Sequence, residues 1–466
     1  MKKTGAVRNM DQRSGARLLV NVLLTVVPMW IFFRAYKRFY IDATFWDRGN
    51  YLFLAFYGFL VVLFLAVYGG YKVRQFRTRE LAFSFALAIF ITNFITFFVM
   101  CLIARYMLRP WGVILTSAIQ CVVGVGLYVL ARILLPLAEP PVPVLYIRRD
   151  DADENFAEKF DSRRSRYVVG GTASPEMSWE DLKNAIEPYA AVLIGAMPRD
   201  IRQELISYCF ITGRSALLKP DMGDIVLCSA TPMVMSDALL YDLNTQGEDL
   251  TYRTLKRSFD ILSSLLGLIV LSPLMLGVAV AIKINDGGPV FFRQIRLTRG
   301  GRRFRLVKFR SMVVNAESRT GAVLAGKDDD RITKVGRFIR STRIDELPQL
   351  WNILMGDMSL VGPRPERPEF YRTICEEYPE FEYRLKVKAG LTGYAQLYGR
   401  YNTTFAEKAR LDMYYIQHAS LLWDLQLIFY TLKIIFFRES AEGVQDERAP
   451  ANAGEEKEEE KDVQTV

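Results

Sequence analysis

The chain has 466 residues, of which 51% are hydrophobic and 13% aromatic, and the hydrophobic residues are collected in long blocks. This distribution excludes an ordinary soluble globular protein and is typical of a membrane protein with two or three domains. The five cysteines show no CxxC spacing and His418 is the only histidine, so neither a disulfide framework nor a zinc site is expected.

The net charge of +9 is unevenly distributed along the chain. The last 28 residues, from Glu439, carry ten acidic and three basic side chains, so the remainder has a charge of +16. A basic surface beside apolar blocks favours anionic lipid headgroups or phosphorylated substrates as partners, and nucleic acid is not expected. Residues 439–466 are predicted to form a disordered acidic tail.

Four apolar blocks open the chain, and each is about as long as a bilayer-spanning helix: residues 18–33, 51–71, 81–104 and 113–137. We therefore predict a transmembrane four-helix bundle over residues 1–138. Cations before the first block and between the second and third favour a cytoplasmic N-terminus, whereas those between the first and second oppose it. No cleavable signal peptide is expected, because five positive charges precede the first block and no small-residue cleavage site follows it.

Residues 139–250 are predicted to form a cytoplasmic, Rossmann-like α/β domain. The Pro-rich segment Glu139–Pro143 is expected to end the fourth helix and act as a stiff linker. After it, short apolar runs alternate with segments of helical periodicity, which indicates a parallel sheet. The expected strands are 144–147, 167–169, 191–194 and 216–218, and the expected helices are 179–187 and 199–212. Gly170-Gly171 is interpreted as a turn, because no GxGxxG motif is present.

A fifth apolar block covers residues 261–284 and is long enough to span a bilayer. Both of its flanks are basic, and basic flanks favour the cytoplasmic side. A straight crossing would place the two flanks on opposite sides of the membrane, against this preference. Ser272-Pro273 lies at its centre, and proline breaks or kinks a helix because it lacks a backbone donor. We predict a re-entrant helix-break-helix that dips into one leaflet, with a straight crossing as the alternative.

Residues 251–438 are predicted to form one monotopic catalytic domain, so that the whole chain is a membrane protein of mixed α and α/β class. Near its end, residues 421–437 have helical, mainly apolar character. An interfacial amphipathic helix and a buried domain helix both fit this segment.

The adjacent carboxylates Asp345 and Glu346 are the candidate centre of the chemistry. The spacing of apolar residues from Ile344 to Leu354 predicts a helix with Asp345 as its N-cap and Pro348 in its first turn. Free N–H groups at such a helix start would favour a phosphate. The simpler interpretation is that Asp345 only caps the helix and Glu346 faces water.

Basic residues surround these carboxylates in sequence. Phe and Val alternate with Lys308 and Arg310, which would place both cations on one side of a strand that borders a phosphate groove. Gly362-Pro-Arg-Pro365 is expected to hold Arg364 on a rigid turn, from which a guanidinium can bind two phosphate oxygens.

Six ordered motifs over residues 250–440 resemble the bacterial sugar transferases, which are monotopic polyprenyl-phosphate phosphoglycosyl transferases. The motifs are Lys256-Arg-Ser-Phe-Asp260, the Ser-Pro-broken hairpin, Gly-Pro-Val-Phe-Phe-x-Gln, Lys-Phe-Arg-Ser-Met, Asp-Glu-Leu-Pro-Gln-Leu-Trp-Asn and Gly-Asp-Met-Ser-Leu-Val-Gly-Pro-Arg-Pro. The four-helix N-terminus and the α/β domain resemble the long subgroup that starts capsule, exopolysaccharide or O-antigen synthesis.

The resemblance implies transfer of a hexose 1-phosphate, galactose or glucose first, from a UDP-sugar to undecaprenyl phosphate at the cytoplasmic face of a bacterial inner membrane. It implies that Asp345 is the nucleophile and that Glu346 is a ligand of Mg²⁺. The implied substrate-binding residues are Arg340, Arg364, Pro363, Pro365, Lys308 and Arg310, and Ser272 and Pro273 break the membrane helix. Ala389 departs from the family, which usually has proline there, so the loop around it is expected to be less rigid.

Two alternatives to this enzyme remain open from the sequence. A catalytically inactive membrane scaffold or regulator of polysaccharide assembly would keep the architecture without turnover. A multi-span transferase with a sequential mechanism would need the fifth block to cross the bilayer. The sequence also leaves open a homodimer and does not specify which sugar is bound.

Overall fold

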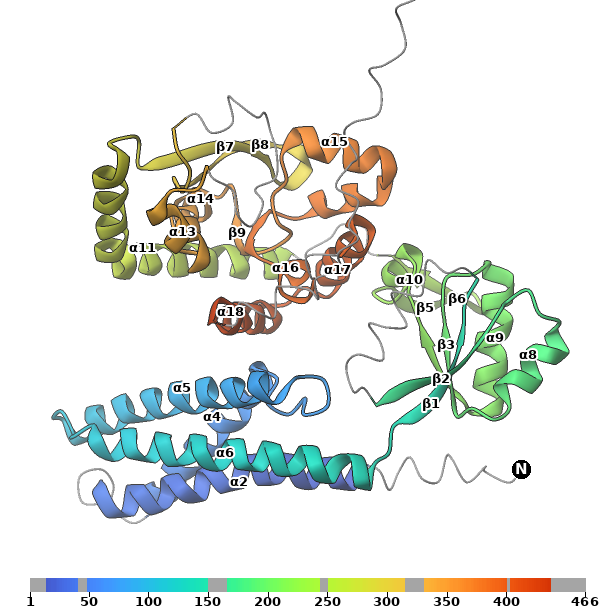
Figure 1. Ribbon diagram of the computed structural model, residues 1–466, viewed down its shortest axis with the longest axis horizontal. Coiled ribbons are helices and arrows are strands. Elements are labelled where there is room, and N and C mark those ends of the chain that lie inside the picture. Colours follow the sequence, from blue (N-terminus) through green and yellow to red (C-terminus); the bar gives the residue numbers. More distant parts are fainter. Residues whose placement is uncertain are drawn as a thin grey trace, which may run out of the picture.

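The computed structural model describes residues 14–40, 48–149, 166–243, 250–314, 331–399 and 403–436. These residues form a bundle of long helices, an α/β region with a parallel sheet, and a C-terminal region of short helices and strands arranged around one long helix (Figure 1). The predicted acidic tail from Glu439 lies outside the described residues.

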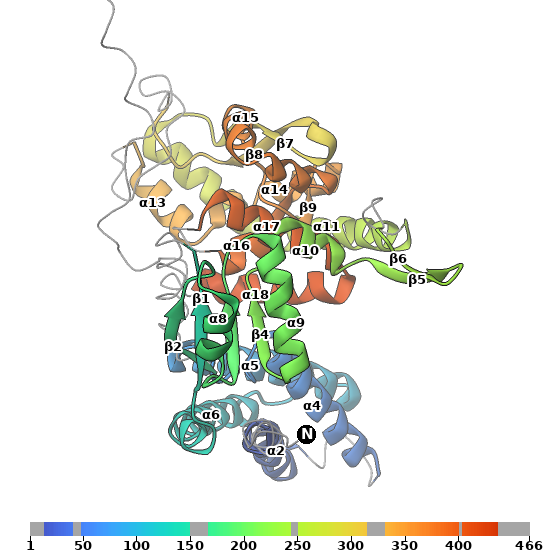
Figure 2. The ribbon, with the colours of Figure 1, turned by 90° about the vertical axis from the view of Figure 1, so that its right-hand side faces the viewer.

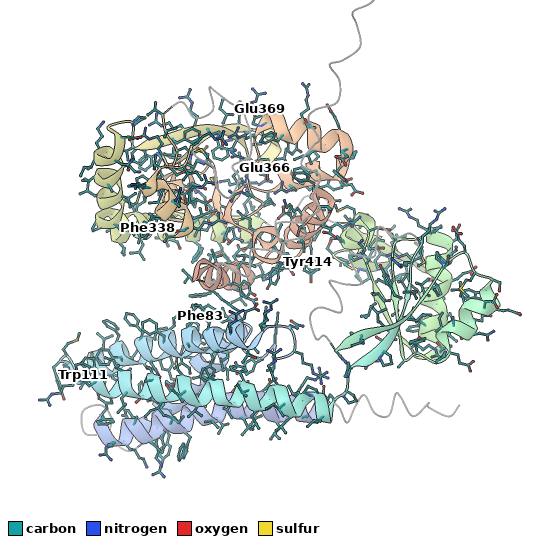
Figure 3. The ribbon with its side chains drawn as sticks, viewed as in Figure 1. Phe83, Trp111, Phe338, Glu366, Glu369 and Tyr414 are labelled. Atoms are coloured by element: carbon teal, nitrogen blue, oxygen red, sulfur yellow. The ribbon has the colours of Figure 1, made fainter. Side chains whose placement is uncertain are left out.

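The bundle contains the four long apolar helices that were predicted, lying side by side (Figure 1). They are α2 (Ser14–Phe39), α4 (Arg48–Val67), α5 (Thr78–Ala104) and α6 (Trp111–Ala138). Each is long and apolar enough to cross a membrane. Large apolar side chains are exposed along all four helices, and Trp111 lies at the end of the bundle away from the sheet (Figure 3). The protein is therefore a membrane protein.

Polar side chains inside the bundle form a closed hydrogen-bonded network. The Tyr57 hydroxyl donates to Asn93 Oδ1 at 3.0 Å and accepts from Gln120 Nε2 at 2.8 Å. Asn93 Nδ2 donates to Gln120 Oε1 at 2.9 Å and to Ser117 Oγ at 2.7 Å. Because polar groups in a bilayer interior need partners within the protein, this network specifies how α4, α5 and α6 pack.

Glu139 ties the bundle to the linker that follows it. Its carboxylate is buried and lies 3.0 Å from Arg17 Nε and 3.7 Å from Arg74 Nη2. The start of α2, the α4–α5 connection and the end of α6 thus meet at one carboxylate.

The α/β region contains a parallel four-stranded sheet in the order β2-β1-β3-β4. The strands are β1 (Val142–Ile147), β2 (Tyr167–Ala173), β3 (Ala191–Ile194) and β4 (Ser215–Leu218). Helices α8 (Trp179–Ile186) and α9 (Arg199–Thr212) connect β2 to β3 and β3 to β4. All four predicted strands and both predicted helices are confirmed. The interpretation of Gly170-Gly171 as a turn is wrong, because both glycines lie within β2, which continues to Ala173.

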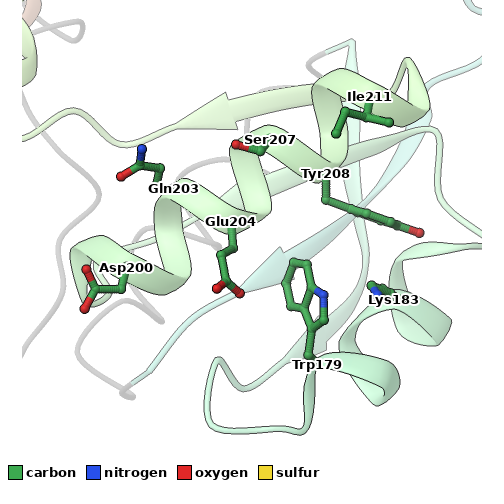
Figure 4. A pocket seen from close by; sticks show the side chains of 8 residues that line it. All are labelled: Trp179, Lys183, Asp200, Gln203, Glu204, Ser207, Tyr208 and Ile211. Atoms are coloured by element: carbon green, nitrogen blue, oxygen red, sulfur yellow. The ribbon is translucent and has the colours of Figure 1, made fainter.

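An open depression of about 660 Å³ lies between α8 and α9 (Figure 4). Trp179 and Tyr208 face one another in it with ring centroids 5.8 Å apart, and Lys183 lies over the Trp179 ring. The depression belongs to the α/β region, so it is separate from the paired carboxylates Asp345 and Glu346.

Helix α10 (Met222–Leu227) joins the α/β region to the C-terminal region, because Met222 and Ile225 are buried in the C-terminal core. The antiparallel hairpin of β5 (Thr231–Met235) and β6 (Ala238–Asp242) follows and projects away from the body of the molecule (Figure 2). All ten of its strand residues are exposed. The exposed hairpin does not test whether the protein forms a homodimer, so the homodimer stays a prediction.

The C-terminal region is arranged around α11 (Leu250–Asp286). Its strands are β7 (Phe291–Leu297), β8 (Arg303–Phe309), β9 (Ser359–Val361) and β10 (Gly390–Thr392). Its α-helices are α13 (Lys334–Ser341), α14 (Gln349–Met355), α15 (Pro368–Glu377), α16 (Tyr394–Tyr398), α17 (Phe405–His418) and α18 (Leu421–Phe436). Three 3₁₀ segments complete it: η2 (Arg299–Gly301), η3 (Ile344–Glu346) and η4 (Pro379–Lys386).

Helix α11 bends within its length, and the rest of the region packs into the inner side of the bend (Figure 1). Pro273 lies inside the helix and cannot donate to the carbonyl of Ile269, one turn earlier. The Ser272 hydroxyl donates to that carbonyl instead, at 2.7 Å. The Ser-Pro pair thus opens the helix without leaving a carbonyl unpaired, as apolar surroundings require.

The two arms of α11, before and after Pro273, pack against different elements of the C-terminal region. Leu268 and Leu271, before the proline, pack against the cluster that joins β8 to α14. Val278 and Ile282, after it, pack against Phe309 and against α13. The bend therefore decides how β8, α13 and α14 lie relative to one another.

A buried ion pair fixes the first turns of α11. Lys256 Nζ lies 2.6 Å from Asp424 Oδ2 on α18, and Tyr415 on α17 donates to Asp424 Oδ1 at 2.6 Å. Both members of the pair are nearly inaccessible, so replacing either alone would leave an unpaired buried charge.

Helix α18 lies between the C-terminal region and the bundle (Figure 1). Leu427 is in the core of the C-terminal region, whereas Phe429 packs edge-on against Phe64 and Tyr68 of the bundle. Of the two alternatives for this segment, a helix buried within the protein is the one that the packing favours.

We expect both ends of α11 to face the same side of the membrane. Single cysteines from Arg253→Cys and Asn285→Cys, each in a chain whose own cysteines are serine, should react with an impermeant maleimide from the same side in inverted vesicles. Adding Ser272→Ala and Pro273→Ala should let α11 straighten and move position 285 to the other side, because the missing intrahelical hydrogen bond is restored. Labelling from opposite sides without these changes would show that α11 crosses the bilayer.

Candidate active site

The paired carboxylates lie on a 3₁₀ turn rather than at the start of an α-helix. Helix α13 ends at Ser341, Arg343 adopts a left-handed conformation with φ of 58°, and η3 begins directly afterwards. The prediction that Asp345 is an N-cap is wrong, and so is the placement of Pro348 in the first turn: Pro348 is itself the N-cap of α14. The left-handed residue turns the chain sharply enough to bring Arg340 back towards the carboxylates.

Asp345 is a buried carboxylate whose Oδ1 has no hydrogen-bond partner. Burial raises its pKa from 3.8 to about 6, and neighbouring Glu346 adds to the rise. Lys308, Arg343 and Arg340 act in the opposite direction. A capping carboxylate would accept a backbone N–H, so the unpartnered oxygen argues against the simple capping interpretation.

Glu346 is held by two arginines at the same oxygen. Its Oε1 accepts a hydrogen bond from Arg343 Nη1 at 3.2 Å and lies 3.6 Å from Arg364 Nη2. Burial alone would raise the pKa of Glu346, but Arg364, Arg343 and Lys308 outweigh it and lower the pKa below its ordinary value. The two neighbouring carboxylates are thus pushed in opposite directions, a pattern typical of functional sites.

Lys308 comes from β8, which pairs with β7 in an antiparallel ribbon. Asn352 of α14 locks that ribbon in place, since its Nδ2 donates to Arg305 O at 2.9 Å and its Oδ1 accepts from Val307 N at 3.0 Å. Burial lowers the pKa of Lys308, Asp345 opposes this effect, and the nearby arginines of the site add to it. Lys308 therefore lies near Asp345, and its predicted role in binding phosphate stays a prediction.

Arg310 lies just after β8 and has a different partner. Its guanidinium forms a salt bridge with Asp286, the last residue of α11. The other face of this group approaches Gly288, where a Cβ would collide with Nη1. Arg310 therefore joins the end of α11 to β8, and its role in substrate binding stays a prediction.

The Pro363-Arg364-Pro365 segment is fixed through its backbone. Pro363 O accepts from Gly390 N at 2.9 Å, and Pro365 O accepts from Arg296 Nη1 at 3.0 Å. Arg364 O accepts from Arg384 Nη2 at 3.2 Å. Both prolines are buried while Arg364 is exposed, so the turn presents one guanidinium from a rigid frame.

Ala389, where the family usually has proline, makes a hydrogen bond that proline could not. Its N–H donates to Thr298 Oγ1 at 3.2 Å, and its carbonyl accepts from Ser359 N at 2.8 Å. The loop is thus tied on both sides at this residue, and its lower rigidity stays a prediction.

The donors at the site fit a magnesium ion only together with a phosphate. Among the described residues, no group of three or more His, Cys, Asp or Glu side chains could hold a metal. Glu346 and the unpartnered Asp345 oxygen offer one or two carboxylates. Mg²⁺ is commonly held by one or two carboxylates together with substrate phosphates and water, so these residues suit a metal that arrives with a diphosphate.

Sequence reasoning assigned no role to four residues that shape the site: Arg343, Arg296, Asn352 and Arg384. Arg384 is buried and bonded to Asp412 Oδ2 at 2.6 Å, so it anchors the Arg364 turn from behind. Asn352 lay within a quoted motif and could have been recognised there. The roles of Arg384 and Arg296 depend on contacts across 20 and 69 positions, which no local pattern reveals, whereas Arg343 lies only three positions from Glu346 and could have been recognised as its neighbour.

Comparison with known proteins supports the same region as the functional one. Residues 251–438 match the family model described as bacterial sugar transferase. The chain is 45% identical over 188 residues to the UDP-N-acetylgalactosamine-undecaprenyl-phosphate N-acetylgalactosaminephosphotransferase of Aeromonas hydrophila, which covers 40% of this chain and 44% of that protein. It is 42% identical over 210 residues to the UDP-glucose:undecaprenyl-phosphate glucose-1-phosphate transferase of Klebsiella pneumoniae, covering 43% and 44%.

A shorter relative is matched over most of its length. The exopolysaccharide production protein ExoY of Sinorhizobium fredii is 39% identical over 199 residues, which is 39% of this chain and 84% of that protein. By contrast, the match spans less than half of the Aeromonas and Klebsiella relatives. The similarity is therefore concentrated in the region built around α11.

Asp345→Asn should make the protein more stable at neutral pH. The folded protein binds the Asp345 proton more tightly than the unfolded chain, so stability is lost as the pH rises from about 4 through about 6. Removing the charge should restore about 2 to 3 kcal/mol above pH 6 and little below pH 4. Thermal unfolding in detergent at pH 8 and pH 5 would measure this, with exposed Glu369→Gln as the control. A lower unfolding temperature for Asp345→Asn at pH 8 would contradict it.

Proposed function

We propose that this protein, which belongs to the bacterial sugar transferase family, transfers a hexose 1-phosphate from a UDP-sugar to undecaprenyl phosphate. The products would be UMP and an undecaprenyl diphosphate sugar, at the start of capsule, exopolysaccharide or O-antigen synthesis. The observation that carries the proposal is Asp345: a buried, unpartnered carboxylate oxygen beside four cations, within the region that matches the family.

The reaction would proceed in two displacements at one phosphorus. An Asp345 carboxylate oxygen attacks the sugar-bearing phosphorus, the bond from that phosphorus to the bridging oxygen breaks, and UMP leaves with the bonding electrons. A phosphate oxygen of undecaprenyl phosphate then attacks the same phosphorus and releases the Asp345 carboxylate. One diphosphate is broken and another is made, so the protein has mainly to position the groups and stabilise charge.

Each cation of the site would neutralise part of the negative charge of the phosphates. Arg364, on its fixed turn, and Arg340, at the end of α13, would bind the diphosphate oxygens as forked donors. Lys308 is buried beside Asp345 and would stabilise the ionised nucleophile and the phosphoryl group that it receives. Mg²⁺ bound at Glu346 would neutralise the departing UMP.

The acceptor would reach the site from the membrane. The bend of α11 supports a re-entrant hairpin that enters one leaflet, which we propose is the cytoplasmic leaflet of the inner membrane, with the α/β region on the cytoplasmic side. The phosphate group of undecaprenyl phosphate, at the level of the lipid headgroups, would then lie at the same depth as Asp345 and Glu346.

The sugar remains the least specified part of the proposal. The names of the relatives include galactose, glucose and N-acetylgalactosamine. We propose galactose or glucose first, with an N-acetylated hexose as the next candidate. UMP release across a panel of UDP-sugars would decide between them.

Asp345→Asn should abolish transfer of radiolabelled sugar phosphate to lipid, because an amide is not a nucleophile for phosphorus. The loss should be at least about 1,000-fold in kcat, with UDP-sugar binding retained. Glu369→Gln, an exposed change on α15, serves as the matched control and should keep full activity. Turnover in Asp345→Asn would remove this residue from the role of nucleophile and revive a sequential mechanism. An unaltered chain that releases no UMP from any UDP-sugar would support the inactive scaffold.

Glu346→Gln should raise the Mg²⁺ concentration needed for half-maximal UMP release by at least about tenfold, since a carboxylate ligand is lost. A titration of Mg²⁺ at saturating UDP-sugar would measure it, and exposed Glu369→Gln on α15 gives the control. An unchanged Mg²⁺ requirement would exclude Glu346 as a ligand.

A further inference from the structure

Arg343 has a backbone conformation that its residue type does not favour. It follows α13 in the left-handed region, with φ of 58° and ψ of 14°, a position usually taken by glycine or asparagine. An arginine there is disfavoured, because its Cβ crowds the neighbouring backbone. Its side chain is 56% exposed, so packing does not explain why the residue is tolerated.

The one described contact of its guanidinium is with the carboxylate that would hold the metal. Nη1 of Arg343 lies 3.2 Å from Glu346 Oε1, and the Arg364 guanidinium approaches the same oxygen at 3.6 Å. Arg364 is held by backbone contacts on a rigid turn. Arg343 stands on an exposed turn three residues from its partner, so it is the arginine that can leave this oxygen most easily.

The charges of the site make metal binding dependent on a second ligand. The described cations here are Lys308, Arg340, Arg343 and Arg364, and the carboxylates are Asp345 and Glu346. With all of them ionised, the site has a net charge of +2 before any ligand binds. A divalent cation alone would meet repulsion, whereas a diphosphate brings negative charge that offsets it.

We propose that Arg343 makes metal binding at Glu346 conditional on a nucleoside diphosphate. Without the nucleotide, Arg343 occupies Oε1 of Glu346 and excludes a free divalent cation. When the diphosphate binds with its metal, Arg343 leaves Oε1 and donates to a diphosphate oxygen. This inference rests on the proposed function, deepens the role of the same site, and gives Arg343 two alternating partners, Glu346 and the diphosphate.

Such a device would favour the productive order of binding. A metal held alone at Glu346 would recruit any phosphate, whereas a site that accepts metal and diphosphate together selects the nucleotide-sugar. By linkage, the factor by which the nucleotide strengthens metal binding equals the factor by which the metal strengthens nucleotide binding.

Arg343→Asn is the sharpest variant, because asparagine removes the charge and tolerates the left-handed backbone. The full chain in detergent would be titrated with Mn²⁺, with and without UDP, and free Mn²⁺ followed by electron paramagnetic resonance. We expect Arg343→Asn to bind Mn²⁺ alone about 3- to 10-fold more tightly than the unaltered chain, and the strengthening by UDP to shrink by a similar factor. Its unfolding temperature should not fall.

The matched control is Arg337→Asn, which removes an exposed arginine of α13 and changes the net charge equally. It should leave Mn²⁺ binding unchanged. An equal gain in this control, or an unchanged Mn²⁺ affinity in Arg343→Asn, would overturn the inference. If the chain released no UMP from UDP-sugars while Arg343→Asn still shifted Mn²⁺ binding, the proposed reaction would fail and the role of Arg343 would stand.

Discussion

The structure of the C-terminal region depends on one missing hydrogen-bond donor. Pro273 cannot bond to the carbonyl of Ile269, and the Ser272 hydroxyl takes its place, so α11 can bend without an unpaired polar group. Each arm of the bent helix then forms its own hydrophobic cluster, one with β8 and α14 and the other with Phe309 and α13. A straight α11 could not contact both sets, and the residues that carry the chemistry would lie apart.

Within this arrangement, the site contains more positive than negative charge. Buried Asp345 and half-buried Glu346 lie among more cations than they can neutralise, and their pKa values move in opposite directions. Asp345 lacks a partner for one oxygen, whereas Glu346 has two guanidinium groups at one oxygen. An excess of positive charge is what a doubly charged diphosphate would need. Burial of the Asp345 charge makes the folded protein less stable at neutral pH than it would be with a neutral residue at this position, a common cost of functional sites.

The surrounding contacts show how rigid this frame is. Asn352 fixes the β7–β8 ribbon, Arg384 and Arg296 fix the Arg364 turn, and Ala389 gains a hydrogen bond that the usual proline would lose. Among the described cations of the site, Arg343 is the one on a strained and exposed turn. The contrast between a fixed frame and one movable cation is what suggests a gating role for that residue.

The sequence by itself determined the four long apolar helices, the parallel strands and helices of the α/β region, the break at Ser272-Pro273, and the identity of the paired carboxylates. These follow from hydrophobic periodicity, from the chemistry of proline and from an ordered set of motifs, all of which are local. Only the tertiary structure decided that Asp345 lies on a 3₁₀ turn rather than at an N-cap, that Arg310 binds Asp286, and that Arg343 reaches Glu346. The physical reason is that the left-handed backbone at Arg343 and the salt bridge between Asp286 and Arg310, 24 positions apart, depend on how the chain turns and packs in three dimensions, which sequence motifs do not record.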